Sequence, residues 1–368
     1  MTKSITEWLL AVPDQGWPRR HSEDLKQHAQ SDALFHLAVQ QSVRSRSLVR
    51  HFAGRMPRRL FIGANLAGFD YRHPGFEVTV LEASFFRDAD PAVRAARRDL
   101  LADSVVLVNN NDVGRDGGAP HYAEFFARCD RTLFVVWDWD NHHWLDNSVA
   151  AAAHADLYAP AHHENLYLLS RYNGSCCGPV YCATIQWPRT FLADRLGAML
   201  ETPRSDEPLG MHVPYAGFTF RNRVVTTLGQ HFPQVGFASH AFHDRTPDDR
   251  LMEWCRHKLH WIIPVLNDVP IRLFDALITG GIPLVPESMR YLPPVDRLDR
   301  GHVEFYGPQD VVDPRPLIER ALRKFDAAGR DGIAARHRLA LEHHHAERRV
   351  DAMLERLAEK FALDLPRR

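Results

Sequence analysis

The sequence has few cysteines, no long apolar run and almost no net charge. Five cysteines in 368 residues argue against a disulfide framework and favour a reducing cytoplasm. The longest apolar runs, Trp261 to Leu266 and Leu133 to Trp137, are far shorter than the roughly 20 residues that a membrane-spanning helix needs. Because 45 Lys and Arg residues balance 46 Asp and Glu residues, the chain lacks the overall positive charge of a nucleic-acid-binding protein.

Several short motifs are absent as well. The sequence has no Gly-x-Gly-x-x-Gly and no Walker A pattern, which argues against a dinucleotide-dependent oxidoreductase and a P-loop kinase. It has no Cys-x-x-Cys, so structural zinc is not expected. The N-terminus carries only a short apolar stretch rather than a secretory signal, and we expect a cytoplasmic protein.

The composition is that of a globular protein, with 45% hydrophobic and 25% charged residues. After a mostly helical segment at 1–59, β-rich runs alternate with stretches of helical length, which predicts a parallel sheet covered on both faces. The expected strands of this first series are Leu60–Ala64, Val78–Ala83, Ser104–Asn109, Leu133–Trp137, Ala155–Ala159 and Val180–Ile185.

A polar, Pro-containing break at 201–208 separates this series from a second one. Helices are expected at Phe220–His231, Asp248–His257 and Val269–Thr279, with strands at Leu209–Val213, Val235–Ser239, Trp261–Leu266, Ile282–Pro286 and Val303–Tyr306. We therefore predict an α/β protein with two Rossmann-like, doubly wound lobes, divided as 1–59, 60–203, 204–330 and 331–368. On the long C-terminal helices, His343 to His345 are expected on a solvated face.

The most informative segment is His260 to Pro286, which has the pattern strand, turn, helix, Gly stop, strand. Asp268 is a good N-cap, and Gly280 with Gly281 ends the helix. The helix N-terminus then points out of a strand end, where its amides and dipole favour a phosphate. Arg272 adds positive charge and Asp275 is available to ribose hydroxyls; alternatively, these two side chains form only an intrahelical ion pair.

The stretch Val269-Pro-Ile-Arg-Leu-Phe-Asp-Ala-Leu-Ile-Thr-Gly-Gly-Ile-Pro-Leu-Val285 resembles the C-terminal lobe of GT-B glycosyltransferases, especially the group related to spore-coat and polysaccharide glycosyltransferases. The resemblance implies that Asp275 binds the nucleoside ribose. This chain has Asp where the family usually has Glu, and Asn267 where many retaining members have a first Glu. We take Asn267 and Asp268 as further candidates for donor binding, and Asn267 also as a catalytic candidate.

Two arginines begin the second lobe's first helix. Arg221 and Arg223 follow the strand Leu209–Val213 and its Gly-containing loop. Cations in a first helical turn oppose the helix dipole unless an anion is bound there. They are therefore candidates for neutralising the donor's phosphate, with exposed surface arginines as the alternative.

On the acceptor side, the strand at Leu133 ends in Trp137-Asp-Trp-Asp-Asn-His-His-Trp144. Asp138 or His142 is a candidate general base for an acceptor hydroxyl. Alternatively, Asp138 and Asp140 chelate a metal in a phosphatase or other hydrolase, or the group simply caps the next helix.

The N-terminal segment adds a possible partner surface. From Ala33 to Phe69 the sequence has six arginines and no acidic residue: Arg44, Arg46, Arg50, Arg55, Arg58 and Arg59. This pattern is typical of a solvated face or of contact with a phosphate-bearing surface such as anionic lipid. The second interpretation places the chain at the inner face of the cell membrane.

Taken with the resemblance, these features predict a glycosyltransferase that moves sugar from a nucleotide-sugar to a glycan or lipid-linked acceptor in bacterial surface polysaccharide assembly. We expect no metal, no further cofactor and no nucleic-acid partner. The alternatives are the metal-dependent phosphatase or hydrolase and a non-catalytic, glycosyltransferase-like binding protein.

Overall fold

A computed structural model describes residues 23, 27, 32–88, 90–114, 118–141, 145–162, 173–215, 217–238, 245–266 and 268–366. These residues form two compact units. The first unit draws on 1–57, 84–179 and 358–364, and the second on 58–83, 180–357 and 365–368. The four domain limits expected from the sequence stay a prediction. Among the described residues, no helix has both the length and the apolar character needed to cross a bilayer.

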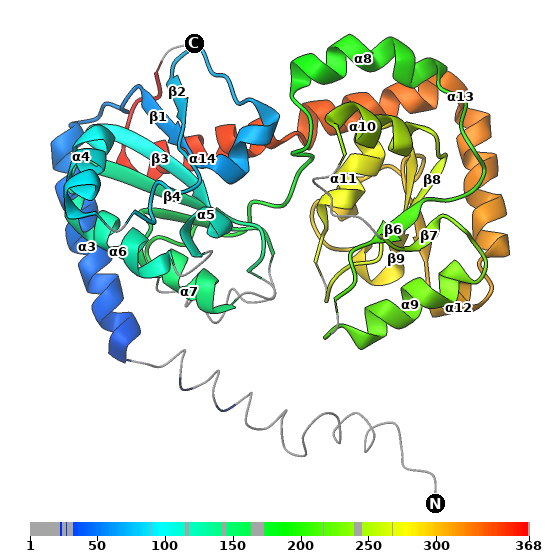
Figure 1. Cartoon of the computed structure of the whole chain (residues 1–368), viewed down its shortest axis with the longest axis horizontal. Helices are drawn as coiled ribbons and strands as arrows, with labels where there is room; N and C mark the ends of the chain where they lie inside the picture. Colours follow the sequence, from blue (N-terminus) through cyan, green and yellow to red (C-terminus); the bar gives the residue numbers. More distant parts are fainter. Residues whose placement is uncertain are drawn as a thin grey trace, which may run out of the picture. The chain divides into compact units, whose positions relative to one another are not determined.

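The first series of strands forms a five-stranded sheet in the order β2-β1-β3-β4-β5 (Figure 1). The pairs β1–β2, β3–β4 and β4–β5 are parallel, which confirms the predicted parallel sheet. Every residue of β3 and β4 is buried, as expected for strands covered on both faces. The strands are β1 Arg59–Ile62, β2 Glu77–Val80, β3 Ser104–Asn109, β4 Thr132–Asp138 and β5 Leu157–Pro160.

A long helix precedes these strands, and shorter helices follow them in the chain. Asp90 caps α4 by accepting a hydrogen bond from the Ala92 amide, and Pro91 occupies the first helical position. In this part of the chain the helices are α3 Asp32–Phe52, η1 Ala64–Phe69, α4 Pro91–Leu101, α5 Asn110–Gly114, α6 Ala119–Arg128 and α7 Leu145–Ala153.

The second series forms the strand core of the second unit. Strands β8, β9 and β10 are parallel neighbours, as are β6 and β7. The Leu209 amide donates to the Leu259 carbonyl, and the Trp261 amide donates to the Leu209 carbonyl, so β6 lies beside β8. The three-stranded sheet β8–β10 and the two-stranded sheet β6–β7 are thus joined by one parallel bridge between Leu209 and His260, which gives the strand order β7-β6-β8-β9-β10. The strands are β6 Gly210–His212, β7 Val235–Phe237, β8 Leu259–Trp261, β9 Ile282–Pro286 and β10 Glu304–Tyr306.

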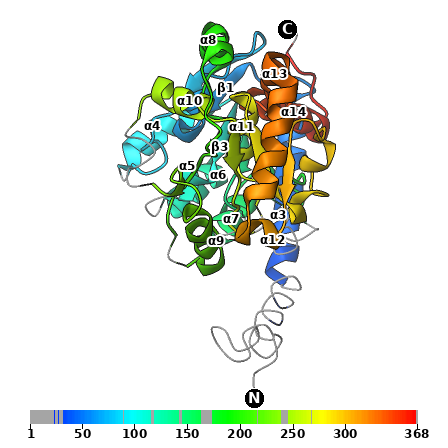
Figure 2. The ribbon, with the colours of Figure 1, turned by 90° about the vertical axis from the view of Figure 1, so that its right-hand side faces the viewer.

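Helices pack against these strands and close the chain. Helix α11 lies beside α13 (Figures 1 and 2), and the path of α13 breaks at Gly329, which has a φ of 52°. The helices are α8 Arg189–Glu201, α9 Thr219–Gly229, α10 Pro247–Cys255, α11 Ile271–Ile278, η4 Glu287–Met289, η5 Val295–Arg297, α12 Pro308–Val312, α13 Arg315–His343 and α14 Ala346–Phe361.

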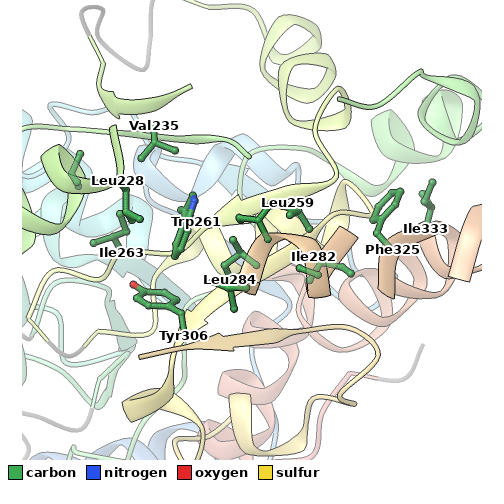
Figure 3. Packing of buried hydrophobic residues seen from close by; sticks show 14 residues of the cluster. Leu228, Val235, Leu259, Trp261, Ile263, Ile282, Leu284, Tyr306, Phe325 and Ile333 are labelled. Carbon is green, nitrogen blue, oxygen red and sulfur yellow. The ribbon is translucent and has the colours of Figure 1, made fainter. Parts of the chain in front are cut away.

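The core of the second unit is an apolar cluster between strands and helices. Figure 3 shows Trp261 of β8 and Leu284 of β9 among apolar side chains that come from α9 and α13. Phe325 and Ile333 place α13 against this cluster. Each side chain in it is less than a tenth exposed. This packing holds the strand ends, and the loops beyond them, in fixed positions.

Three expectations from the sequence are wrong. The run Val180–Ile185 is not a strand and makes only one isolated bridge, between Thr184 and His345. Strand β8 ends at Trp261, where the predicted strand begins. His344 and His345 are buried rather than solvated, because α13 ends at His343 and the chain turns inward; the Nε2 of His345 bonds the Trp187 carbonyl at 3.0 Å.

Candidate functional site

The strand order of the second unit creates a switch point between β6 and β8. From β6 the chain proceeds outward to β7, and from β8 it proceeds in the other direction to β9 and β10. In open α/β sheets, ligands bind beyond the carboxyl ends of strands at such a point. The side chains found there come from the end of β6, the first turn of α9 and the first turn of α11.

Arg221 is the contribution of α9 to this point. It is 7% exposed, its Nη1 donates to the Val213 carbonyl at 2.9 Å, and its Nε donates to the Ile263 carbonyl at 3.4 Å. These carbonyls follow β6 and β8. Burial lowers the pKa of Arg221, although the nearby Tyr215 and Asp268 oppose this. The guanidinium therefore bridges the two strand ends while remaining charged.

Arg272 is the contribution of α11. Its Nη2 donates to the Met211 carbonyl in β6, and its guanidinium lies 5.5 Å from the centre of the Trp254 ring. Burial lowers the pKa of Arg272 to about 10, the nearby Asp275 opposes this, and the charge of Arg221 adds to the lowering. Arg221 and Arg272 thus lie close enough to repel each other, and their hydrogen bonds go to backbone carbonyls in the described chain.

His212 lies behind the two arginines at the last position of β6. It is fully buried, and in the described residues neither ring nitrogen has a hydrogen-bond partner. Burial lowers its pKa well below the usual value, and the charges of Arg272 and Arg221 lower it further. The imidazole is therefore neutral at pH 7. The cluster formed by Arg221, Arg272 and His212, called the arginine cluster below, is an electropositive environment suited to an anion.

The N-terminus of α11 is capped differently from the prediction. The N-cap is Pro270, with no side-chain cap, so the predicted cap at Asp268 is wrong. The Oδ1 of Asp268 instead accepts from the Val265 amide at 2.6 Å, which closes the turn before the helix. Asn267 lies outside the described residues, so its donor-binding and catalytic roles stay predictions.

Asp275 is placed away from solvent. It is 1% exposed, and its Oδ2 accepts a hydrogen bond from the Nε2 of Gln186. Burial raises its pKa to about 7, against the opposing effects of Thr184, Gln186 and Arg272. One oxygen of Asp275 is thus bound to a side chain of this chain, and ribose binding by Asp275 stays a prediction.

Arg223 lies apart from the arginine cluster. It is exposed, because two residues along an α-helix turn its side chain by about 200° from that of Arg221. The sequence pattern that grouped the two arginines did not distinguish the buried face of α9 from its solvent face.

In the first unit, the carboxyl end of β4 carries a buried acid. Asp138 is fully buried, its Oδ2 accepts from the Tyr158 hydroxyl at 2.7 Å, and its Oδ1 accepts from the Asp140 amide at 3.0 Å. Burial raises its pKa to about 6, although the nearby Ser148 and the hydrogen bonds from Tyr158 and the Asp140 amide oppose this. Asp138 is therefore mainly ionised at pH 7 but close to its titration point.

Asp140 belongs to a network of amides around this acid. Its Oδ2 accepts from the side chains of Asn110 and Asn111, both at 3.2 Å. The Nε2 of His162 lies 2.9 Å from the Trp139 carbonyl and must donate to it, since a carbonyl only accepts. The two carboxylates thus have different hydrogen-bond partners. His142 lies outside the described residues. Among the described ones, no three His, Cys, Asp or Glu side chains come together as a metal site.

An open hollow of about 470 Å³ lies elsewhere in the second unit, beside η1 and β2. Its lining includes Leu66, Val78 and Val80, and the charge of Arg72 is paired with Asp70 at 2.6 Å. A largely apolar wall with an internally paired cation is a poor receptor for phosphate. The arginine cluster is therefore the better candidate site.

Sequence reasoning missed His212, Gln186 and Trp254. A signal for His212 existed, because the histidine directly ends the strand that leads into the loop before Arg221. Gln186 carried no local signal, since it lies 89 positions before its partner Asp275. No known protein family matches the chain, and no curated protein matches it significantly.

Proposed function

We propose that this chain is a GT-B-like glycosyltransferase that moves a sugar from a nucleotide-sugar to a glycan or lipid-linked acceptor in bacterial surface polysaccharide assembly. The observation that carries the proposal is the arginine cluster at the switch point of the second sheet. Two guanidinium groups are held there by backbone carbonyls and repel each other until an anion binds. The pattern of the Val269–Val285 segment supports the same reading.

In the proposed reaction, the acceptor hydroxyl oxygen attacks the anomeric carbon of the donor sugar. The bond between that carbon and the phosphate oxygen breaks, and the nucleotide leaves with the bonding electron pair. Arg221 and Arg272 stabilise the negative charge that develops on the phosphate. Such fixed charges act in the transition state without the reorganisation that water needs.

Asp138 is the proposed base for the proton of the acceptor hydroxyl. With a pKa of about 6, it is mainly ionised at neutral pH and accepts a proton more readily than an ordinary carboxylate. The Tyr158 hydroxyl holds one of its oxygens in place. In the runner-up hydrolase, both Asp138 and Asp140 would have to face a metal ion. Asp138 and Asp140 instead accept hydrogen bonds from different groups, which gives the metal-dependent hydrolase no support.

The proposal is tested with a panel of UDP-, GDP-, CMP- and dTDP-sugars, measuring donor hydrolysis and transfer. We expect Arg221→Ala and Arg272→Ala each to lower kcat/KM by about 100-fold, the usual cost of removing one group that stabilises transition-state charge. Arg223→Ala, on the same helix but exposed, is the matched control and should retain full activity.

Three outcomes would contradict the proposal. The arginine assignment fails if both alanine variants turn over donor at the wild-type rate. A chain that binds a nucleotide-sugar but neither hydrolyses nor transfers it would be the non-catalytic binding protein. Activity on phosphate esters that is lost on adding a chelator would favour the hydrolase.

A further inference from the structure

Helix α3 packs on the first unit through one face only. Leu48 and Phe52 are buried on that face. Arg44 also points inward: its Nε and Nη2 donate to the two carboxylate oxygens of Asp156, at 2.7 and 3.0 Å, and its guanidinium lies 4.2 Å from the centre of the Phe126 ring. Of the arginines in this acid-free segment, Arg44 is therefore a structural residue and is not available to a partner.

The opposite face of α3 carries an exposed apolar stripe. Phe35 is 68% exposed, Val39 46% and Val43 57%, and Arg46 and Arg50 are exposed as well. At 100° per residue, these five side chains fall within an arc of about 80°, on the side of the helix opposite Leu48. They extend over about 22 Å of helix. We call this surface the α3 stripe.

The charge of the α3 stripe has one sign. The Nε atoms of Arg46 and Arg50 donate weakly to the Ser42 and Arg46 carbonyls one turn earlier, at 3.4 and 3.3 Å, and the Nη2 of Arg46 donates to the Ser42 hydroxyl at 3.4 Å. No Asp or Glu occurs between Ala33 and Phe69. Asp32, the first residue of α3, is exposed on the same side one turn before Phe35 and is the one acidic residue in the helix sequence. A second copy of this helix would therefore bring two arginines and one carboxylate on this side, a net positive charge. A partner rich in phosphate groups supplies the missing negative charge together with an apolar layer.

We propose that the α3 stripe binds an anionic lipid bilayer, with α3 lying in the plane of the interface. Phe35, Val39 and Val43 enter the boundary between headgroups and acyl chains, and Arg46 and Arg50 bind lipid phosphates. Amphipathic helices with basic and aromatic residues bind membranes in this way. This inference goes beyond the proposed transferase activity and does not depend on it.

The test is co-sedimentation of the full chain with vesicles of phosphatidylcholine alone, or of phosphatidylcholine with 30% phosphatidylglycerol. Wild type should bind the anionic vesicles at least tenfold more tightly than the neutral ones, and added salt should weaken this binding. Arg46→Gln with Arg50→Gln should weaken anionic binding by about 25-fold, at about fivefold for each basic side chain. Phe35→Ser with Val39→Ser should weaken it by about tenfold or more.

Matched controls use exposed residues of the second unit. Val312 is 66% exposed, and the side chains of Arg315 and Arg323 are 81% and 73% exposed. Val312→Ser, and Arg315→Gln with Arg323→Gln, should bind vesicles like wild type. Equal wild-type binding to neutral and anionic vesicles would overturn the proposal, as would stripe variants that bind like wild type. A dimer that Phe35→Ser with Val39→Ser converts to monomer, measured by light scattering, would instead assign the stripe to a second copy.

Discussion

Asp275 and Arg272 lie one helical turn apart on α11, yet each is held by a group outside the helix. Arg272 donates to the Met211 carbonyl, and Asp275 accepts from Gln186. The simple alternative of an intrahelical ion pair is therefore not what the structure shows. Because Asp275 is buried, its pKa is raised to about 7, and the ionised form is the less stable one at this position.

This raised pKa predicts how stability depends on pH. An unfolded Asp titrates near 3.9, so between about pH 4 and 7 the folded chain holds a proton that the unfolded chain has lost. The free energy of unfolding therefore falls as the pH rises through this window. Asp275→Asn keeps an oxygen acceptor for Gln186 without the charge. Its stability relative to wild type should rise by about 2–4 kcal/mol between pH 5 and 8.

Urea unfolding at the two pH values measures this difference. Asp248→Asn is the control, because the Arg195 hydrogen bond lowers the pKa of the exposed Asp248 and that group is fully ionised from pH 5 upward. Its effect should be the same at both pH values. A constant difference between Asp275→Asn and wild type would show that Asp275 titrates like an ordinary carboxyl.

At the residue level, the sequence supports some assignments better than others. The sequence predicts Arg221 and Arg272 as site residues because each begins a helix that follows a strand end. The structure places both beside the end of β6, and their binding role stays a prediction. The inward direction of Arg44 was not visible, since its partner Asp156 is 112 positions away. Burial of His345 was missed for a similar reason: the turn after His343 depends on contacts with the distant Trp187. Long-range partners decide these cases, and local spacing does not record them.

At the scale of elements, the end of α11 is fixed by basic side chains and two glycines. His337 donates to the Ile278 carbonyl, Arg204 to the Thr279 carbonyl and Arg336 to the Gly280 carbonyl. These donors lie at the C-terminal end of α11, where the helix dipole is negative. Gly280 has a φ of +78°, and a Cβ there would lie 2.4 Å from the Cγ2 of Ile333. A Cβ at Gly281 would lie 2.4 Å from the ring of His260.

We therefore expect Gly280→Ala and Gly281→Ala each to destabilise the second unit by about 2–4 kcal/mol, because a buried ring or an α13 side chain must move. At Gly280 the positive φ adds strain. Gly197, inside α8, has no atom within 4 Å of its Cβ position, so Gly197→Ala should stabilise by about 0.5–1 kcal/mol. Denaturant unfolding compares the three, and equal stability of all three variants would show that the close packing around α11 is absent.

Element ends were predicted with uneven success, and the reasons are physical. β3 and β9 have the predicted limits because polar or Gly residues flank them. The apolar run at Ile262–Leu266 continues past the end of β8 without being a strand, because Pro264 cannot donate a ladder hydrogen bond. Ile262 and Ile263 are buried there, whereas Leu266 is 51% exposed. Val180–Ile185 is a similar case, because Val180, Cys182 and Ala183 are buried in irregular chain. Hydrophobic periodicity alone does not distinguish such a buried irregular segment from a strand.

At the scale of the whole molecule, the parallel five-stranded sheet was predictable because strands alternate with helix-length segments. The order of the strands was harder to predict, because it depends on pairings between residues far apart in sequence, such as Leu209 and Leu259. That order is what places a switch point between β6 and β8. The candidate site follows from the topology as much as from its arginines.

If the switch point binds the nucleotide, protection should be confined to the elements that form it. In hydrogen exchange, adding the tightest-binding nucleotide should slow exchange in peptides covering 209–222 and 259–279. Peptides covering 104–114 and 132–141, at the β3 and β4 ends, should be unchanged when no acceptor is present.

At 100 times the dissociation constant, nucleotide binding stabilises the folded chain by about 2.7 kcal/mol. That is enough to slow exchange about 100-fold at amides that open together with the site. Arg221→Ala with Arg272→Ala should lose this protection, and a chelator should leave it intact, because the cluster's own positive charge binds the phosphate. Protection that appears instead around Asp138, or that disappears with the chelator, would place the ligand in the first unit and return the metal-dependent reading to consideration.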